Sequence, residues 1–145
     1  MTRPLRFYVL VLPTLPWPAL VERFQHLEAL DFDLAGFADH FVDWGQPGNH
    51  WYELWTWIAG IAQATQRIRL LTSVAQIPLR DPATLANQAL TVDHISHGRL
   101  ELGLGIGVKG LDPSYEMMGI PDWSNAERVE RLGEIEEVLD RMRTR

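Results

Sequence analysis

Four apolar, strand-like runs alternate along the chain with stretches of helical spacing, and this alternation restricts the possible folds more than any other feature. The runs occupy residues 6–13, 32–38, 67–75 and 99–105. Strands that alternate with helical patterns are typical of parallel βαβ units, in which helices cover the sheet. The sequence therefore predicts an α/β fold with four complete βα units, whereas a closed barrel of this type needs eight.

A helical pattern follows each run, and most of these patterns have an identifiable start. Pro18 is tolerated in a first turn, Asp81 precedes Pro82 as a cap, and Ser124 with Glu127 has the spacing of a capping box. The apolar positions that we expect to face the core are Leu20, Phe24, Leu27 and Leu30; Trp51, Leu54, Trp55, Ile58, Ile61 and Ala62; Leu85, Ala89, Val92 and Ile95 or Ser96; and Leu132, Ile135, Leu139 and Met142.

A glycine pattern, G-x-G-x-x-G, occurs at Gly105, Gly107 and Gly110, where the fourth run ends. A dinucleotide-binding loop of this spacing requires a helix directly after the turn, whose N-terminus receives the pyrophosphate. Pro113 and Pro121 lie in the segment that follows and disfavour a long helix there. NAD binding is therefore a minor alternative, and the glycines need another explanation.

Charge and composition exclude several classes of protein. The net charge of -6 argues against a nucleic-acid surface, and no apolar run has the length of a membrane span, so we expect a cytoplasmic protein. The absence of cysteine excludes disulfides, thiolate metal sites and cysteine nucleophiles. His94 and His97 have H-x-x-H spacing without a supporting carboxylate cluster, so no metal site is predicted. The acidic residues and arginines of the last helical pattern, Arg128 and Arg131 among them, are typical of a solvated helix face.

Several segments, in their order and spacing, are similar to those of one known family. They are FDLAGFADHF (32–41), ELWTWIAGIAQATQRIRLLTSV (53–74), PLRDPATLANQALTVDHISHGRLELGLGIG (78–107) and MMGIPDWSNAERVERLGEIEEVL (117–139). The chain resembles the N-terminal half of the luciferase-like monooxygenases, TIM-barrel oxidoreductases that use FMN or the deazaflavin coenzyme F420. The resemblance implies that residues 1–145 form one partial domain, roughly the first four βα units of a (β/α)8 barrel.

The resemblance also implies site residues at the carboxyl ends of the strands, where barrel enzymes keep their chemistry. In family members a histidine at the position of His40 contacts the cofactor ring or takes part in proton transfer, and Asp39 would orient it or cap its loop. Trp44 matches a position that lines the substrate pocket in some F420-using relatives. Some members carry a non-proline cis peptide that bulges towards the ring, and Ser73 and Val74 match it.

The glycines after the fourth run let the backbone pass close to the flavin-like ring in this family, since a residue without a Cβ atom permits close approach. Gly105, Ile106 and Gly107 are therefore implied as cofactor-binding positions, while Gly103, inside the strand, is expected to serve packing. The implied set comprises His40 and Asp39 as catalytic residues, His40, Ser73, Val74, Gly105, Ile106 and Gly107 as cofactor-binding residues, and Trp44 in the substrate pocket, with no metal.

The implied function is that of an FMN- or F420-dependent oxidoreductase or monooxygenase acting on a small molecule. Either a reduced flavin reacts with dioxygen or the deazaflavin exchanges a hydride. The sequence leaves the cofactor open, with a slight preference for the deazaflavin from the ADHF segment and Trp44.

In this family, residues from later strands hold much of the cofactor's phosphate-containing tail. Three states therefore remain open: a truncated product with little activity, a half-barrel that pairs with itself as a homo-oligomer, or a piece completed by another chain. The alternative function is a non-catalytic half-barrel that acts as an oligomerisation or interaction module, because a lone half exposes strand edges and apolar surface.

Overall fold

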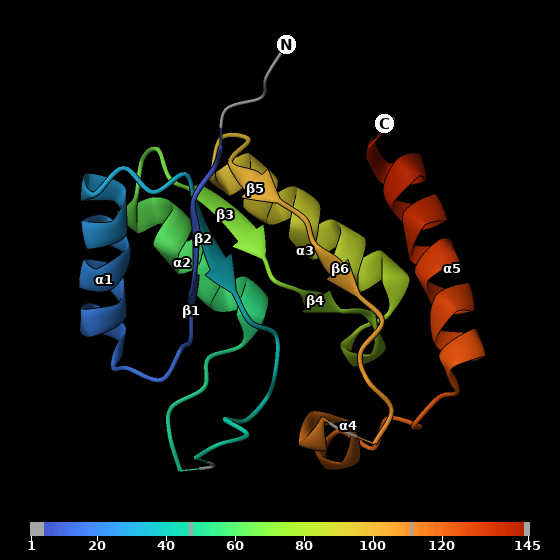
Figure 1. Ribbon diagram of the computed structural model, residues 1–145. Helices are drawn as coiled ribbons and strands as arrows, with labels where there is room; N and C mark the ends of the chain where they lie inside the picture. Colours follow the sequence, from blue (N-terminus) through green and yellow to red (C-terminus); the bar gives the residue numbers. More distant parts are fainter. Residues whose placement is uncertain (1–4, 47, 111, 144–145) are drawn as a thin grey trace.

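The computed structural model describes residues 5–46, 48–110 and 112–143, and a parallel sheet lies at its centre (Figure 1). Four strands pair in the order β1-β2-β3-β5, and a second, two-stranded sheet pairs β4 with β6. The bounds are β1 Tyr8–Val11, β2 Leu34–Phe37, β3 Arg69–Thr72, β4 Ala75–Gln76, β5 Leu100–Glu101 and β6 Leu104–Gly105. Every described pairing is parallel, so the predicted α/β fold is confirmed.

Helices follow the strands in the predicted alternation. The four long helices lie on the outside of the sheet, and α5 stands at the end away from β1 (Figure 1). Two short helices, η1 and α4, lie in the connections after β4 and β6. The bounds are α1 Trp17–Ala29, α2 Leu54–Ala64, η1 Ile77–Leu79, α3 Pro82–Ile95, α4 Pro113–Met117 and α5 Asn125–Arg143.

The predicted helix starts are confirmed. Asp81 Oδ1 accepts a hydrogen bond from the Thr84 N–H at 2.9 Å, so Asp81 is the N-cap of α3. At α5, Glu127 Oε2 accepts from the Ser124 N–H at 2.8 Å, and Ser124 Oγ accepts from the Glu127 N–H at 3.3 Å. This is the reciprocal pair of a capping box. None of the helices that the structure describes is both long and apolar enough to cross a bilayer.

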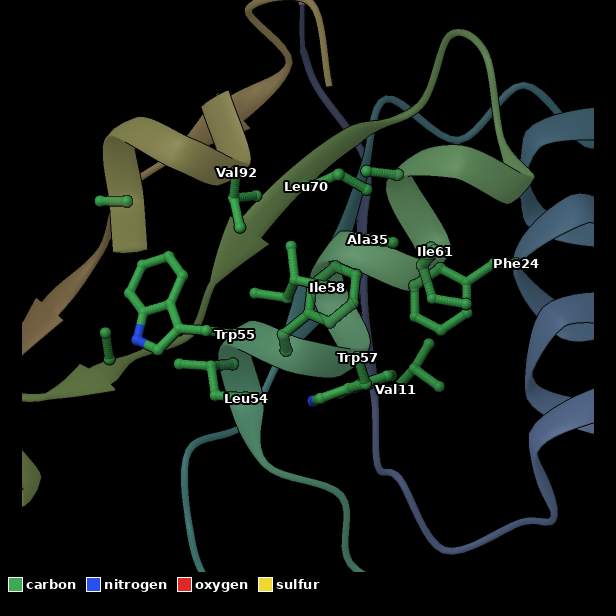
Figure 2. Close-up of a cluster of buried hydrophobic side chains, with 14 of the residues drawn as sticks. Val11, Phe24, Ala35, Leu54, Trp55, Trp57, Ile58, Ile61, Leu70 and Val92 are labelled. Atoms are coloured by element: carbon green, nitrogen blue, oxygen red, sulfur yellow. The ribbon is translucent and has the colours of Figure 1, made fainter. Parts of the chain in front are cut away.

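The hydrophobic core lies between the sheet and the first three helices, and α2 contributes much of it (Figure 2). Phe24 of α1 stacks on Phe37 of β2 with ring centroids 5.0 Å apart, and the Trp57 ring contacts both of them. Trp57 was not among the predicted core positions, although its side chain is buried. Leu30 was predicted to be in the core and is exposed, because α1 ends before it and Leu30 is the C-cap residue.

The third and fourth strand runs are each interrupted, and the two interruptions lie side by side. Between β3 and β4 the Ser73-Val74 peptide bond is cis. Between β5 and β6, Gly103 both accepts from and donates to Thr72 Oγ1, each at 2.8 Å. A Cβ atom on Gly103 would lie 2.3 Å from the Thr72 carbonyl oxygen, so the backbones approach too closely for any side chain. The prediction that Gly103 serves packing is confirmed.

The sheet is curved, because side chains from strands that are not neighbours in the sheet contact one another across one of its faces. Arg6, just before β1, and Arg69 of β3 both pair with the carboxylate of Glu101 in β5. Three flat strand spacings would separate β1 from β5 by about 14 Å. The Tyr8 hydroxyl likewise lies 2.8 Å from Ser73 Oγ, and its ring passes over Gly36. Strong curvature of a parallel sheet is the geometry of a barrel wall.

Candidate functional site

The carboxyl ends of the strands bring together most of the predicted site residues. His40 follows β2, Ser73 and Val74 follow β3, and Gly105 ends β6, so these segments share one edge of the molecule with α4 (Figure 1). Val74 packs directly on Gly105, where a Cβ atom would lie 2.2 Å from Val74 Cγ2. The cis peptide and the glycine loop are therefore in contact.

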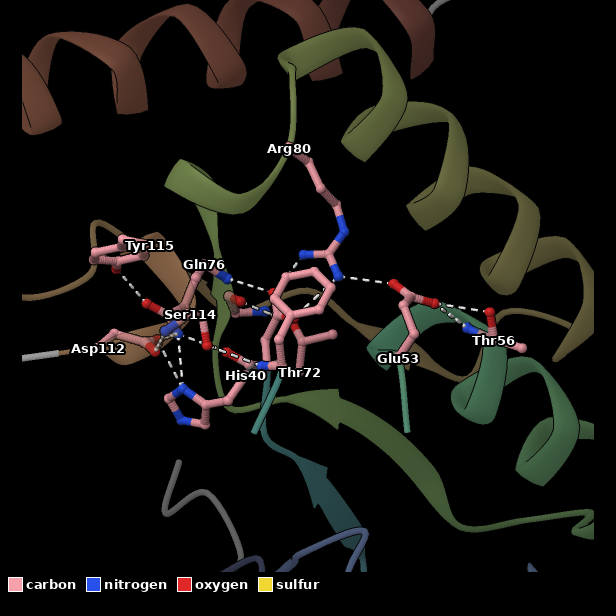
Figure 3. A network of polar contacts seen from close by, with 12 residues as sticks. His40, Glu53, Thr56, Thr72, Gln76, Arg80, Asp112, Ser114 and Tyr115 are labelled. Carbon is pink, nitrogen blue, oxygen red and sulfur yellow. Dashed lines mark hydrogen bonds and ion pairs between the residues drawn. The ribbon is translucent and has the colours of Figure 1, made fainter. Parts of the chain in front are cut away.

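His40 lies at the centre of this edge, and its side chain is 24% exposed. The ring nitrogen Nδ1 is 2.9 Å from Asp112 Oδ2 and 3.0 Å from Gln76 Nε2 (Figure 3). Two indoles flank the imidazole, with ring centroids at 4.5 Å for Trp44 and 5.6 Å for Trp51. Within residues 5–46, 48–110 and 112–143, no atom hydrogen-bonds to His40 Nε2. The structure thus places Trp44 beside His40 and leaves one imidazole nitrogen available.

Asp39 does not contact the His40 ring, so the expectation that it would orient this ring is wrong. Its carboxylate is buried and receives two hydrogen bonds from Arg80, together with the Gln76 N–H at 2.8 Å. Burial raises the pKa of Asp39, and the Arg80 guanidinium opposes this shift. Arg80 also donates to Glu53 Oε1 at 2.8 Å. Asp39 therefore holds the loop after β2 against the segment after β4.

Asp112, at the N-cap of α4, is the carboxylate that contacts His40. Its side chain is 1% exposed, and it accepts from the Ser114 N–H at 2.8 Å and from Gln76 Nε2 at 2.6 Å. Burial alone would raise the pKa of Asp112, but hydrogen bonds from Ser114, Gln76 and His40 outweigh it, so the pKa lies below its usual range. Ser114 Oγ also accepts from the Phe41 N–H at 2.9 Å, which ties α4 to the His40 loop.

Arg128 was predicted to lie on a solvated helix face, and this prediction is wrong. Its side chain is fully buried and donates to the Ile106 carbonyl at 2.8 Å, to the Trp123 carbonyl at 3.0 Å and to Asp122 Oδ1 at 2.9 Å. Its guanidinium also lies over the Tyr115 ring, 5.1 Å from the centroid. Arg128 thereby links the start of α5 to the glycine loop.

The glycine loop does not have the geometry of a dinucleotide-binding turn. The helix that follows, α4, has only five residues, as the prolines predicted, and the Asp112 side chain occupies its N-terminus. Gly107 has a φ of 71°, and a Cβ atom there would lie 1.8 Å from the Tyr115 hydroxyl. Internal packing therefore requires glycine at Gly105 and Gly107.

One cavity lies away from this edge, and another, of about 520 Å³, is lined by Asp112 and Tyr115 of the polar network. In the part of the chain that the structure describes, no three His, Cys, Asp or Glu side chains gather in a way that could hold a metal ion. A cavity of about 570 Å³ lies between α3 and α5 and is lined by residues such as Leu90, Leu100 and Leu139. It contains none of the groups that contact His40, so we locate the candidate site by the polar network.

Sequence reasoning missed four residues of this network, namely Gln76, Arg80, Asp112 and Tyr115. Gln76 connects them: its Nε2 bonds Asp112, and its Oε1 accepts from the Tyr115 hydroxyl at 2.5 Å. Asp112 had a local signal, because an aspartate directly before a proline is a typical helix start. Gln76 had none, since its partners lie 36 to 39 residues away.

Parallel βα units with a polar and aromatic network at the carboxyl ends of the strands are typical of barrel-type α/β proteins, which bind their ligands at that end. A family model described as luciferase-like monooxygenase matches residues 6–145. The chain belongs to the luciferase-like monooxygenase family, as its segments suggested.

Two groups of relatives have different stated activities. The chain is 31% identical to an F420-dependent glucose-6-phosphate dehydrogenase of Intrasporangium calvum over 126 residues, which are 86% of this chain and 38% of that protein. It is 35% identical to the pyrimidine monooxygenase RutA of Yersinia enterocolitica over 130 residues, covering 83% of this chain and 33% of that protein. The chain thus spans only a third to two fifths of the length of these relatives.

Solved structures of similar fold confirm the architecture. An F420-dependent secondary alcohol dehydrogenase in complex with an F420-acetone adduct aligns with a TM-score of 0.77 and 22% identity, over 92% of this chain and 40% of that one. The monooxygenase RslO1 from Streptomyces bottropensis aligns with a TM-score of 0.71 and 26% identity, over 94% of this chain and 42% of that one. The predicted TIM-barrel type, present as a part of the barrel, is confirmed.

The residues at this edge fit a planar ring better than they fit a phosphate group. The exposed Trp44 indole and the exposed Val74 side chain offer apolar surface beside His40 Nε2. The buried cations nearby are already engaged, Arg80 by Asp39 and Glu53, and Arg128 by Asp122 and two carbonyls. The chain's own residues could hold a flavin-like ring, while a phosphate tail would need further contacts.

Proposed function

We propose that this chain supplies the ring-binding end of a flavin- or deazaflavin-dependent oxidoreductase of the luciferase-like class. One observation carries the proposal: His40, with one ring nitrogen available, shares the strand-end edge with the cis Ser73-Val74 peptide and the Gly105 turn that packs on it. The stated activities of the relatives, which include F420-dependent and monooxygenase reactions, support the same class.

In this proposal each group has a defined task. His40 Nε2 accepts a hydrogen bond or a proton from the ligand, and the Trp44 indole forms an apolar wall beside it. Val74 and the Gly105-to-Gly107 turn would contact the ring and exclude water from that side of it. When bound, the ring would supply either hydride exchange or the reaction of its reduced form with dioxygen.

The remaining part of the site comes from outside these residues. Because the chain spans a third to two fifths of its relatives and the nearby buried cations are engaged, we propose that a further half-barrel completes the site. It would be supplied by a second copy or by another segment or chain, and it would provide the phosphate contacts that barrels of this type often place after strands seven and eight. A small-molecule substrate would bind between the two parts.

A fluorescence titration of the purified chain with FMN, riboflavin and F420 tests the ring-binding proposal. We expect saturable binding of one ring system, with riboflavin about as tight as FMN, because the described edge offers ring contacts rather than phosphate contacts. His40→Ala should weaken binding at least tenfold, whereas His50→Ala, which removes an exposed imidazole, should not. A folded chain that binds none of the three ligands would refute the proposal.

A second candidate function, an oligomerisation or interaction module without catalysis, is favoured by the exposed apolar side chains around β1. They are Leu5, Phe7, Tyr8, Leu10 and Leu12. Exposed apolar side chains on an edge strand favour association with a partner. A stable oligomer that binds no ring would favour this function over the first.

A further inference from the structure

His40 Nδ1 has two polar neighbours that make opposite demands on it. The Asp112 carboxylate at 2.9 Å can only accept a hydrogen bond, and the Gln76 amide nitrogen at 3.0 Å can only donate one. A protonated Nδ1 suits Asp112, and an unprotonated Nδ1 suits Gln76. The tautomer of His40 therefore depends on which neighbour prevails.

The surrounding contacts decide in favour of Asp112. Gln76 Nε2 has two hydrogens, and two better acceptors lie within reach: the Asp39 carbonyl at 2.5 Å and Asp112 Oδ2 at 2.6 Å. The Tyr115 hydroxyl donates to Gln76 Oε1 at 2.5 Å, which fixes the amide in this orientation. Gln76 thus has no hydrogen left for His40, and Nδ1 is free to donate to Asp112.

We propose that Asp112 is a positioning residue that holds His40 in the form protonated at Nδ1, so that the unprotonated Nε2 is the atom presented to a ligand. In a neutral histidine, the hydrogen bond made by one ring nitrogen determines whether the other ring nitrogen carries the proton. Nε2 then acts as an acceptor towards an N–H or O–H group of the ligand. The proposal rests on the proposed function only for the identity of that ligand.

The tautomer can be measured directly in the ligand-free chain by long-range ¹H–¹⁵N NMR of the imidazole rings. Spectra are recorded at a pH high enough that the signals of all five histidines no longer change with pH. The signals that are missing from the spectrum of His40→Gln are those of His40. We expect a pyrrole-type Nδ1 and a pyridine-type Nε2. A protonated Nε2 in the wild-type chain would overturn the proposal whether or not any variant folds.

Variants of Asp112 test whether this carboxylate sets the tautomer. In Asp112→Ala the freed Gln76 N–H faces Nδ1, so we expect the proton to move to Nε2. The matched control is Asp43→Ala, because the Asp43 carboxylate lies on the same loop but bonds Gly45, Gln46 and Asn49 instead of His40. A folded Asp112→Ala chain with Nδ1 still protonated would overturn the proposal.

The NMR test and the cofactor titration fail independently. A chain with the expected tautomer that binds no ring refutes the proposed function and leaves the role of Asp112 standing. A chain that binds a ring but has a protonated Nε2 refutes the role of Asp112 and leaves the proposed function standing. In a ring-binding chain, Asp112→Ala should weaken binding about as much as His40→Ala and should also shift the imidazole proton, whereas Asp43→Ala should do neither.

Discussion

At the scale of single residues, the glycine loop depends on positions where the backbone leaves no room for a side chain. Gly107→Ala places a Cβ atom against Tyr115 and Arg128 and also forces a positive φ on alanine. We expect a loss of about 2–4 kcal/mol in the free energy of unfolding, from overpacking together with backbone strain. Urea denaturation measures it. Gly110→Ala is the control: it has a similar φ of 68° but open space around it, so it should lose only about 1 kcal/mol.

The contact between Val74 and Gly105 predicts a compensating pair. Gly105→Ala alone should destabilise the chain by about 1–3 kcal/mol, because the new Cβ atom overlaps Val74 Cγ2. Val74→Ala removes that atom, so the double variant should recover most of the loss, and the coupling free energy should exceed about 0.5 kcal/mol. Additive losses in the double-mutant cycle would show that the two residues do not meet.

Residues whose roles depend on local context could be predicted from the sequence, and those whose roles depend on distant partners could not. Asp81 and Ser124 cap helices through neighbours in the chain, and each was identified correctly. Arg128 was misassigned, because its glutamate-rich surroundings resemble a solvated face while its carbonyl partner, Ile106, lies 22 residues away. The placement of His40 past a strand was predictable, but its partner Asp112 was not.

At the scale of helices and strands, one buried guanidinium joins the carboxyl ends of two helices. All five N–H groups of Arg99 are used: by the Ser96 carbonyl at the end of α3, by the Ala62 and Thr65 carbonyls at the end of α2, and by Thr65 Oγ1 and the Ile68 carbonyl. Burial lowers the pKa of Arg99, and Glu28 opposes the shift. A cation at a helix carboxyl end is also favoured by the helix dipole.

Arg99→Met should therefore destabilise both helix ends at once. We expect a loss of about 2–4 kcal/mol, because several buried carbonyl groups lose their donors. Arg99→Lys should restore only part of it, since an ammonium group cannot reproduce the planar fork. Arg67→Met, which removes an exposed guanidinium in the same region, should cost less than about 1 kcal/mol. Equal losses in the Arg99 and Arg67 variants would contradict this account. Thermal unfolding and urea titration measure the stability of all three variants.

Glu28, near the end of α1, predicts how stability depends on pH. Its carboxylate accepts from the N–H groups of Gln66, Arg67 and Ile68, which lead into β3. Burial would raise the pKa of Glu28, but these backbone hydrogen bonds, with the charge of Arg67, lower it below its ordinary value. A carboxyl group with a lowered pKa in the folded state stabilises the fold above its unfolded pKa, and this contribution is lost as the pH falls through the folded pKa.

The wild-type chain should thus lose more stability on acidification than Glu28→Gln does. Urea midpoints compared between about pH 5 and about pH 3 measure the difference, since glutamine does not titrate in this window. Glu22→Gln, on the exposed side of the same helix, is the control and should follow the wild-type curve. Parallel curves for the wild type and Glu28→Gln would show that the Glu28 contacts contribute no pH-dependent stability.

The elements themselves were predicted better than their interruptions. Periodicity located all four strand runs and all four long helices, since apolar spacing reflects burial. It did not show that two of the runs break, because the breaks arise where Thr72 and Gly103 meet across neighbouring strands. Such a contact depends on the register between strands, which a single strand's sequence does not contain.

At the scale of the whole molecule, the curved sheet has one covered face and one open face. On β1, Val9 and Val11 pack towards the helices, so Tyr8 and Leu10 point to the opposite side. Leu10 is 44% exposed there, and β1 is an edge strand whose outer hydrogen-bonding side has no partner strand in the described chain. An apolar edge of this kind favours association.

We therefore expect the isolated chain to self-associate through this face. Sedimentation velocity over a wide range of concentrations should show an oligomer that Leu10→Lys shifts towards monomer, because a buried, unpaired ammonium group is costly. Val129→Lys is the matched control: Val129 is also exposed but lies on α5, which packs on α3 and η1 at the far end of the sheet from β1. A wild-type chain that stays monomeric throughout, or an equal effect of both lysine variants, would show that the open face is not the site of association. Since the proposed site lies along the border of that same face, loss of the oligomer in Leu10→Lys should also weaken ring binding, which couples assembly to function in one variant.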